Sequence, residues 1–212
     1  MNEFEHKITL TEEEYNHLLM LLGSTPGSTK QINYYYDTDD LSMNAQNVTC
    51  RLRFKNGKYQ ATMKVHMPDS DCSVEIDMPT PCCVEKNVFT AMGLKYQGKL
   101  ITERTVLMKN SEFKIVLDKN IYLGVVDYEV EIEYSDSVKQ SNVDILSHLI
   151  YTLHYEREID CLLDEYEATS YFHHIIDFLE ENAQRFNEKK NVSGFIQNKS
   201  QRFFQRKLTE MG

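Results

Sequence analysis

The chain has 212 residues, enough for one domain with a substantial core or for two small ones. Hydrophobic residues make up 41% and charged residues 26%, a composition that excludes a disordered chain. The 33 Asp+Glu residues outnumber the 23 Lys+Arg residues, so the formal net charge is -10. Such an acidic surface should repel nucleic acids and anionic membranes unless the basic residues are gathered in one place.

Targeting and cysteine patterns indicate a cytoplasmic protein with no nucleic-acid or membrane partner. The first residues contain no apolar run behind a basic head, so we expect no secretory signal. No stretch approaches the roughly 18 uninterrupted apolar residues that a membrane helix needs. The 5 cysteines include no Cys-x-x-Cys spacing, which argues against a disulfide framework or a zinc site. We therefore expect a reducing, cytoplasmic environment.

The N-terminal residues predict a strand followed by a helix. Charged and apolar residues alternate at the start of the chain, which places Glu3, Glu5 and Lys7 on one strand face. A capping box at residues 11–14 then precedes apolar residues at helical spacing, which continue to residue 22.

A β-hairpin is predicted around Asn56-Gly57, the strongest short turn signal in the chain. The strand before this turn carries Arg51 and Arg53 on one face, and the strand after it carries Lys64 in an alternating pattern. Residues 72–78 alternate in the same way and should add another strand.

Further strands are predicted at residues 99–108 and 112–117, after a short helix at 84–92. A later strand has four carboxylates on one face: Asp127, Glu129, Glu131 and Glu133. Like charges on one face repel, so this strand requires Lys or Arg side chains, or a divalent metal ion, opposite it.

The hydrophobic period changes from 2 to 3.6 after residue 135, which predicts a mostly helical segment at about 142–190. This segment could pack on the sheet, cover an entrance or form a dimer, so both a monomer and a homodimer are open. A basic segment follows at 195–208 and carries Lys199 and Arg202.

Charged faces of strands usually point to solvent. If the sheet closes with these faces inward, however, the lumen is lined by both charges and helices cover the apolar faces from outside. Carboxylate oxygens suit Mg²⁺ or Mn²⁺, and several Lys and Arg side chains suit a polyphosphate. Together they have the composition of a phosphoryl-transfer site.

The residues also resemble a known family. Glu3-x-Glu5-x-Lys7 is similar to the opening E-x-E-x-K signature of the CYTH domain, or triphosphate tunnel metalloenzymes. The later motifs follow in the family's order, and they span essentially the whole chain: Tyr35–Thr38, Arg51-x-Arg53, Thr62-x-Lys64, Arg104, Asp118, the Glu129–Glu133 strand and Asn198-Lys199-x-x-Arg202.

This resemblance implies an α+β fold, a closed antiparallel eight-stranded β-barrel or tunnel with helices outside, as a single domain over residues 1–212. It implies a divalent-metal-dependent triphosphatase acting on tripolyphosphate, thiamine triphosphate or a nucleoside triphosphate, with Mg²⁺ or Mn²⁺ as cofactor. Two alternatives remain open: a class IV-type adenylate cyclase that makes cyclic AMP from ATP, and a module that binds a polyphosphate or nucleotide without turnover.

The resemblance also assigns residues to roles. The metal ligands come from Glu3, Glu5, Asp118, Glu129, Glu131 and Glu133, with Glu131 common to both registers of the Glu-x-Glu motif. The triphosphate would be bound by Lys7, Arg51, Arg53, Lys64, Arg104, Lys199 and Arg202. Glu129 or Glu133 would orient or deprotonate the attacking water, and Lys64 would assist catalysis. The chain departs from the family at Thr102, where many relatives have a second basic residue, so one phosphate contact is expected to be missing.

Overall fold

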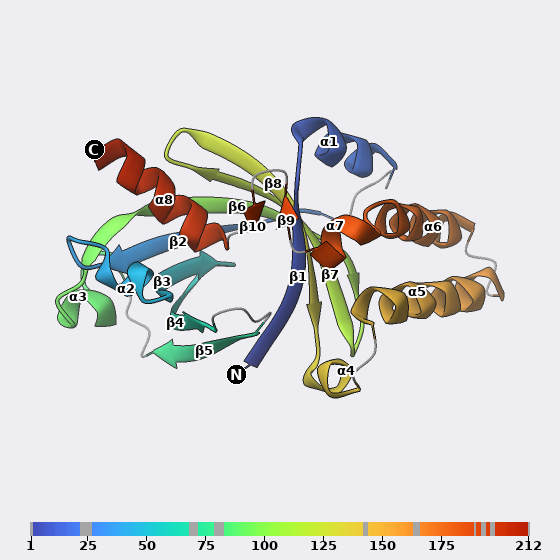
Figure 1. The fold of residues 1–212 in the computed structure, drawn as a ribbon, viewed down its shortest axis with the longest axis horizontal. Helices are drawn as coiled ribbons and strands as arrows, with labels where there is room; N and C mark the ends of the chain where they lie inside the picture. Colours follow the sequence, from blue (N-terminus) through green and yellow to red (C-terminus); the bar gives the residue numbers. More distant parts are fainter. Residues whose placement is uncertain are drawn as a thin grey trace.

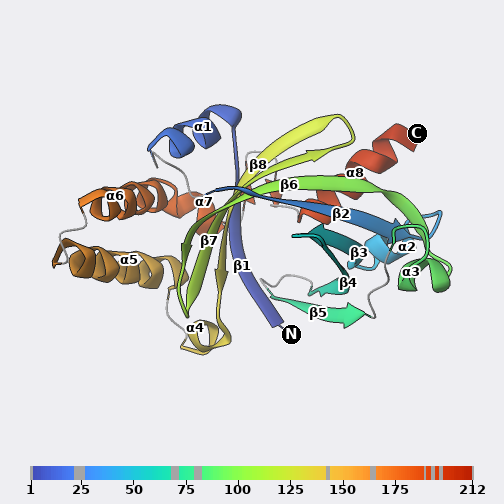
Figure 2. The same ribbon diagram turned by 180° about the vertical axis from the view of Figure 1, so that it is seen from behind.

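The computed structural model of the chain describes residues 2–21, 27–67, 72–78, 83–141, 144–162, 166–188, 190–191, 194–195 and 198–211. Within these ranges it shows eight long strands, several helices and one two-stranded pair (Figures 1 and 2). No described helix has the length and apolar character needed to cross a membrane.

The long strands form a closed antiparallel barrel, which confirms the predicted fold. Their bounds are β1 Asn2–Leu10, β2 Thr29–Asp37, β3 Val48–Lys55, β4 Lys58–His66, β5 Cys72–Met78, β6 Lys95–Lys109, β7 Phe113–Tyr122 and β8 Val125–Tyr134. Their order around the barrel is β1-β5-β4-β3-β2-β6-β7-β8. The seam between β1 and β5 is short, running from the pair Asn2 and Val74 to the pair Phe4 and Cys72.

Local sequence explains the turn between β3 and β4. Asn56 and Gly57 have φ angles of 50° and 75°, left-handed values that these two residue types tolerate well. This tight turn sets the register in which Lys55 pairs with Lys58 and Arg51 pairs with Thr62. The register then fixes which side chains of both strands face the barrel interior.

The helices are α1 Glu12–Leu21, α2 Ser42–Ala45, α3 Val88–Ala91, α4 Asp136–Gln140, α5 Ile145–Leu162, α6 Tyr166–Glu181, α7 Ala183–Glu188 and α8 Lys199–Met211. The short strands β9 Lys190–Asn191 and β10 Gly194–Phe195 pair with each other. In both views α5 and α6 lie side by side on one side of the barrel, and α8 lies on the other (Figures 1 and 2).

The main hydrophobic core lies between the barrel's outer face and the helices α1 and α4 to α7. Ile8 of β1 and Val130 of β8 are buried there with Leu149 of α5 and Leu179 of α6. Burial of such side chains stabilises the fold by about 1.5–3 kcal/mol each. These contacts leave the opposite, polar face of β1, β7 and β8 turned toward the lumen.

Helix α8 packs through a second core, where Phe203 and Phe204 contact Tyr35 and Tyr122. Gly98 of β6 makes room for this packing. A Cβ atom at Gly98 would lie 2.7 Å from the Phe203 Cζ atom, and its φ of 145° is one that other residues rarely adopt. The close approach fixes the start of α8 at the barrel interior.

Some predicted elements differ in length from the observed ones, among them the strand expected at 99–108, which spans Lys95–Lys109 as β6. The helix expected at 84–92 is only Val88–Ala91, because the Asn87 side chain accepts hydrogen bonds from the backbone N–H groups of Phe89 and Thr90 and begins the helix there. Strand β7 continues past residue 117 to Tyr122, because its polar residues point into a polar interior rather than ending the strand.

Candidate functional site

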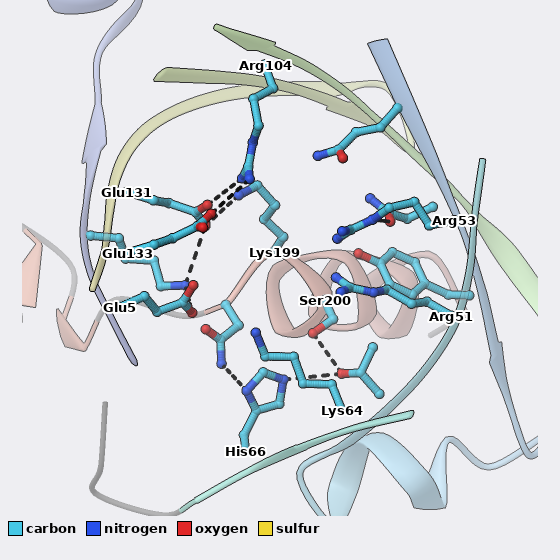
Figure 3. Close-up of a pocket in the computed structure, with 16 residues that line it drawn as sticks. Glu5, Arg51, Arg53, Lys64, His66, Arg104, Glu131, Glu133, Lys199 and Ser200 are labelled. Atoms are coloured by element: carbon cyan, nitrogen blue, oxygen red, sulfur yellow. Dashed lines mark hydrogen bonds and ion pairs between the residues drawn. The ribbon is translucent and has the colours of Figure 1, made fainter. Parts of the chain in front are cut away.

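A cavity lies inside the barrel and is lined by six strands and the start of α8 (Figure 3). Its lining residues are Glu5, Lys7, Gln31, Asn33, Tyr35, Thr49, Arg51, Arg53, Lys64, His66, Arg104, Glu131, Glu133, Asn198, Lys199 and Ser200. Figure 3 shows Glu5, Glu131 and Glu133 on one side and Arg51 and Arg53 on the other. We call these two sides the acidic wall (β1, β7 and β8) and the basic wall (β3 and β4).

Strand pairing builds the acidic wall. Glu5 pairs with Glu133, and Lys7 pairs with Glu131, between β1 and β8. Asp118 of β7 pairs with Glu129 of β8. Because side chains alternate along a strand, this register sends all of these groups to the interior face.

The carboxylates of this wall fit a hard divalent cation. Ligand oxygens of Asp118, Glu129 and Glu131 lie within 4.8 Å of one another. Oxygen ligands of this kind suit Mg²⁺ or Mn²⁺. Glu5, Glu131 and Glu133 line the cavity itself, whereas Asp118 and Glu129 lie behind its surface and are fully buried.

Arginine 104 joins three of these carboxylates. Its Nη2 atom lies 2.6 Å from Asp118 Oδ2 and 2.5 Å from Glu131 Oε2, and its Nη1 atom lies 3.1 Å from Glu133 Oε1. Burial alone would lower the pKa of Arg104, but Glu131 and Asp118 outweigh it and raise that pKa. Arg104 is therefore a fixed positive charge inside the acidic wall.

Cations from α8 reach the same wall. The Lys199 Nζ atom lies 2.9 Å from Asp118 Oδ2 and 2.6 Å from Glu131 Oε1, and it also contacts Glu129 Oε1. Arg202 contacts Asp127 and Glu129 at 2.9 and 2.8 Å. Burial would raise the pKa of Glu131, but Lys199 and Arg104 hold it well below its ordinary value.

Glu5 is held ionised at the edge of the wall. Burial would raise its pKa, but the ammonium groups of Lys7 and Lys64 outweigh burial and lower the pKa to about 2. Lys7 Nζ donates a hydrogen bond of 2.6 Å to Glu5 Oε1. Glu5 is therefore ionised at neutral pH.

The basic wall has fewer counter-charges. Glu75 lies 2.6 Å from Arg51 Nη2 and 3.6 Å from Lys64 Nζ, so one carboxylate contacts two cations. Arg53 donates its Nε–H to Asn33 Oδ1 at 3.0 Å and makes no ion pair with any described residue. Burial, together with the charges of Arg51 and Arg104, lowers the pKa of Arg53 to about 10. This wall is a desolvated positive surface that can accept an anion.

His66 links the basic wall to α8. Its Nδ1 atom lies 2.9 Å from Asn198 Nδ2, and its Nε2 atom lies 3.4 Å from Thr49 Oγ1. Thr49 in turn hydrogen bonds to Ser200 Oγ at 2.9 Å. Burial, with Lys64 nearby, lowers the pKa of His66 to about 4, so the ring is neutral at pH 7.

Most residues expected from the sequence meet in this cavity. Those lining it are Glu5, Lys7, Arg51, Arg53, Lys64, Arg104, Glu131, Glu133 and Lys199. Asp118, Glu129 and Arg202 lie behind the lining and contact one another or Lys199. Glu3 lies in β1 opposite Ser73, and its side chain is outside the described residues.

Some lining residues were not predicted. His66 continues the alternation of Thr62 and Lys64 along β4, and that alternation could have identified it. Asn33 and Tyr35 alternate along β2 in the same way. Neutral polar residues in a strand carry no charge pattern, so these residues could not be selected from their alternation with charges.

Thr102 is the position at which we expected the chain to lack a phosphate contact, because it has no basic residue there. Its hydroxyl donates to Asn120 Oδ1 at 2.8 Å, and Asn120 Nδ2 donates to Asp127 and Glu129. Thr102 is fully buried. This position therefore supports the acidic wall through Asn120.

The fold and this interior define a barrel protein with opposed acidic and basic walls. The CYTH domain model matches residues 1–158, which is more than half of the chain. The chain belongs to the CYTH domain family.

Known relatives agree with this assignment. The chain is 31% identical over 149 residues to YjbK of Bacillus subtilis (strain 168), a candidate triphosphatase, in a match covering 63% of this chain and 78% of YjbK. A solved structure of a candidate adenylate cyclase from Bacillus halodurans matches with a TM-score of 0.56 at 23% identity, covering 95% of this chain and 97% of that one.

A second solved structure is HpAC1 from Hippeastrum, a candidate adenylyl cyclase for which a dominant triphosphatase activity is reported. It matches with a TM-score of 0.50 at 17% identity, covering 71% of this chain and 87% of that one. At these identities both structures support the fold alone.

Proposed function

We propose that this protein is a divalent-metal-dependent triphosphatase that hydrolyses an inorganic or organic triphosphate inside the barrel. The observation that carries this proposal is Arg53, a partly buried guanidinium that faces the cavity without a carboxylate partner among the described residues. A desolvated cation of this kind is stabilised by an anion that enters the cavity. The opposite wall supplies carboxylates for a metal ion that accompanies a triphosphate.

The basic wall would bind the phosphate oxygens. Arg51, Arg53 and Lys64 lie on adjacent strands, so a chain of phosphates can contact them in succession. Arginine forms paired hydrogen bonds with phosphate oxygens, and lysine contributes a compact charge. Lys64 would also stabilise negative charge that develops during phosphoryl transfer.

The acidic wall would hold the metal ion. Glu5, Glu131 and Glu133 are the carboxylates that line the cavity, and they fit Mg²⁺ or Mn²⁺. A bound divalent ion neutralises phosphate charge and polarises the phosphoryl group. Glu133 is the better candidate for orienting the attacking water, because its side chain is 37% exposed whereas Glu129 is fully buried.

Product analysis tests this proposal. The purified full-length protein is incubated with tripolyphosphate, ATP or thiamine triphosphate, with Mg²⁺ or Mn²⁺, and phosphate, pyrophosphate and cyclic AMP are measured. We expect metal-dependent phosphate release that Arg53→Ala or Glu5→Ala abolishes and Lys95→Ala leaves intact, since Lys95 pairs with Asp39 on the surface. Cyclic AMP with pyrophosphate would instead indicate a cyclase, and tight binding without product would indicate a binding module.

A further inference from the structure

The Lys199 ammonium group lies at the place where three carboxylates converge. Ligand oxygens of Asp118, Glu129 and Glu131 are within 4.8 Å of one another, an arrangement able to hold a metal ion. Lys199 Nζ contacts an oxygen of each of these three residues, at 2.9 Å for Asp118 and 2.6 Å for Glu131. The space between the three carboxylates is therefore already taken by a positive charge of this chain.

The hydrogen-bonding capacity of this ammonium group matches its surroundings. A protonated lysine has three N–H donors and no acceptor. Three carboxylates surround it, so each N–H can point at one of them. Burial would lower the pKa of Lys199, but Asp118 and Glu129 outweigh it and raise that pKa, so the group stays charged.

The backbone that carries Lys199 is fixed on both sides of it. The preceding Asn198 hydrogen bonds to His66, and the following Ser200 hydrogen bonds to Thr49, both on the basic-wall strands. Phe203, one turn further along α8, is fully buried against Gly98 and Tyr35. Withdrawal of the ammonium group would require these contacts to break or the side chain to leave three charged partners.

We propose that Lys199 is a built-in cation that occupies the position of a divalent ion among Asp118, Glu129 and Glu131, and thereby restricts metal binding to the carboxylates that line the cavity. Removal of this ammonium group should then create an additional divalent-cation site. The inference concerns cation binding, so it stands or falls separately from the hydrolysis proposed above.

Counting bound Mn²⁺ tests this inference. Full-length protein freed of metal is titrated with Mn²⁺, and free Mn²⁺ is measured by electron paramagnetic resonance. Lys199→Met keeps the length of the side chain but removes its charge, and we expect it to bind one more Mn²⁺ per chain than the unaltered protein. The matched control is Arg206→Met, which removes one exposed positive charge from the same helix. An unchanged or smaller count for Lys199→Met, or an equal gain for Arg206→Met, overturns the inference.

A second variant covers the case in which Lys199→Met does not fold. Asp118→Asn removes one carboxylate of the cluster while Lys199 is retained. If Lys199 occupies the cluster, this variant binds as many Mn²⁺ ions as the unaltered protein. Loss of a bound Mn²⁺ would show that the cluster holds a divalent ion despite Lys199, and would overturn the inference. Neither measurement requires turnover, so an inactive protein still gives an answer.

Discussion

Arg53 on β3 and Asn33 on β2 are joined by a single hydrogen bond of 3.0 Å, from the Arg53 Nε–H to the Asn33 amide oxygen. A neutral amide thus faces a partly buried guanidinium where a carboxylate would balance its charge. A buried charge without a counter-charge opposes folding. Under the function proposed above, the phosphate chain that enters the cavity supplies the missing counter-charge.

Replacement of Arg53 should separate stability from binding. For Arg53→Gln we expect a free energy of unfolding equal to that of the unaltered protein or up to about 1 kcal/mol higher, because an unbalanced buried charge is removed. Binding of tripolyphosphate should weaken about 10- to 100-fold, since a charge-assisted hydrogen bond is lost. Urea unfolding and calorimetric titration measure the two effects. The control Lys58→Gln, at the exposed hairpin end of β4, should change neither the free energy of unfolding nor the binding of tripolyphosphate. Marked destabilisation by Arg53→Gln would contradict the prediction.

Replacement of Arg104 should have the opposite effect on stability. Asp118 is fully buried and contacts the Arg104 guanidinium, which also contacts Glu131. Arg104→Ala removes this guanidinium from both carboxylates. Breaking a buried ion pair from one side costs about 3–5 kcal/mol. In contrast, Lys95→Ala breaks an exposed pair with Asp39 and should cost at most about 1 kcal/mol. Urea unfolding of both variants tests this ranking, and equal losses would refute it.

The stability that Glu5 contributes should depend on pH. Its pKa falls from 4.5 to about 2 on folding, because Lys7 and Lys64 outweigh the opposing effect of burial. A lowered carboxyl pKa stabilises the folded state above the unfolded pKa, and this stabilisation is lost as pH falls toward the folded pKa. We therefore compare the free energy of unfolding of the unaltered protein with that of Glu5→Gln. The pH-dependent part of this difference should be about 3 kcal/mol at pH 7 and should shrink as the pH falls from 4.5 to 2. Unfolding at several pH values measures it; a difference that grows on acidification is the contrary result.

Anion binding should change the titration of His66. Burial lowers its pKa from 6.5 to about 4, and the positive charge of Lys64 is the next cause. A triphosphate on the basic wall offsets that charge, so the pKa of His66 should rise when tripolyphosphate is added without metal. A pH titration of the His66 ring protons, followed by nuclear magnetic resonance, gives the pKa with and without tripolyphosphate. The shift should shrink in Arg53→Gln, and a titration indifferent to the anion would argue against phosphate binding on this wall.

Gly98→Ala should displace α8 from the barrel. The added Cβ atom would lie 2.7 Å from Phe203 Cζ, and the φ of 145° adds backbone strain. Overpacking of this kind costs about 1–3 kcal/mol. Hydrogen exchange should show faster exchange in α8, with tripolyphosphate binding reduced because Asn198 and Ser200, which hydrogen bond to the basic-wall strands, move. Gly57→Ala is a control that strains the backbone without a contact within 4 Å, and it should leave exchange in α8 unchanged.

The alternation of charges along the strands predicted which side chains share a strand face, and the family resemblance predicted that these faces line the barrel interior. Glu5, Lys7, Arg51 and Arg53 all occupy the face that their parity indicated. Side chains in a strand alternate with period 2 whatever their neighbours, so one sequence carries this information.

Pairings between distant elements could not be predicted in the same way. The contacts of the Lys199 ammonium group with Asp118, Glu129 and Glu131 were not predicted. That contact depends on the angle at which α8 enters the barrel, which the Gly98–Phe203 approach determines. Arg53 and Arg104 are likewise indistinguishable as charges in the sequence. Only their neighbours in the fold show that the pKa of Arg53 is lowered and that carboxylates raise the pKa of Arg104.

The placement of α8 at the acidic wall has a consequence for synthesis of the chain. Lys199 follows its partner Glu131 by 68 residues. At about 5–20 residues per second, several seconds pass on the ribosome between the synthesis of β8 and that of α8. During this interval the carboxylates of β7 and β8 lack the ammonium group that later neutralises them, so water or dissolved cations must screen them. Water can be excluded from the acidic wall only after α8 has been synthesised and has packed against the barrel. Closure of this interior is therefore a late event in folding.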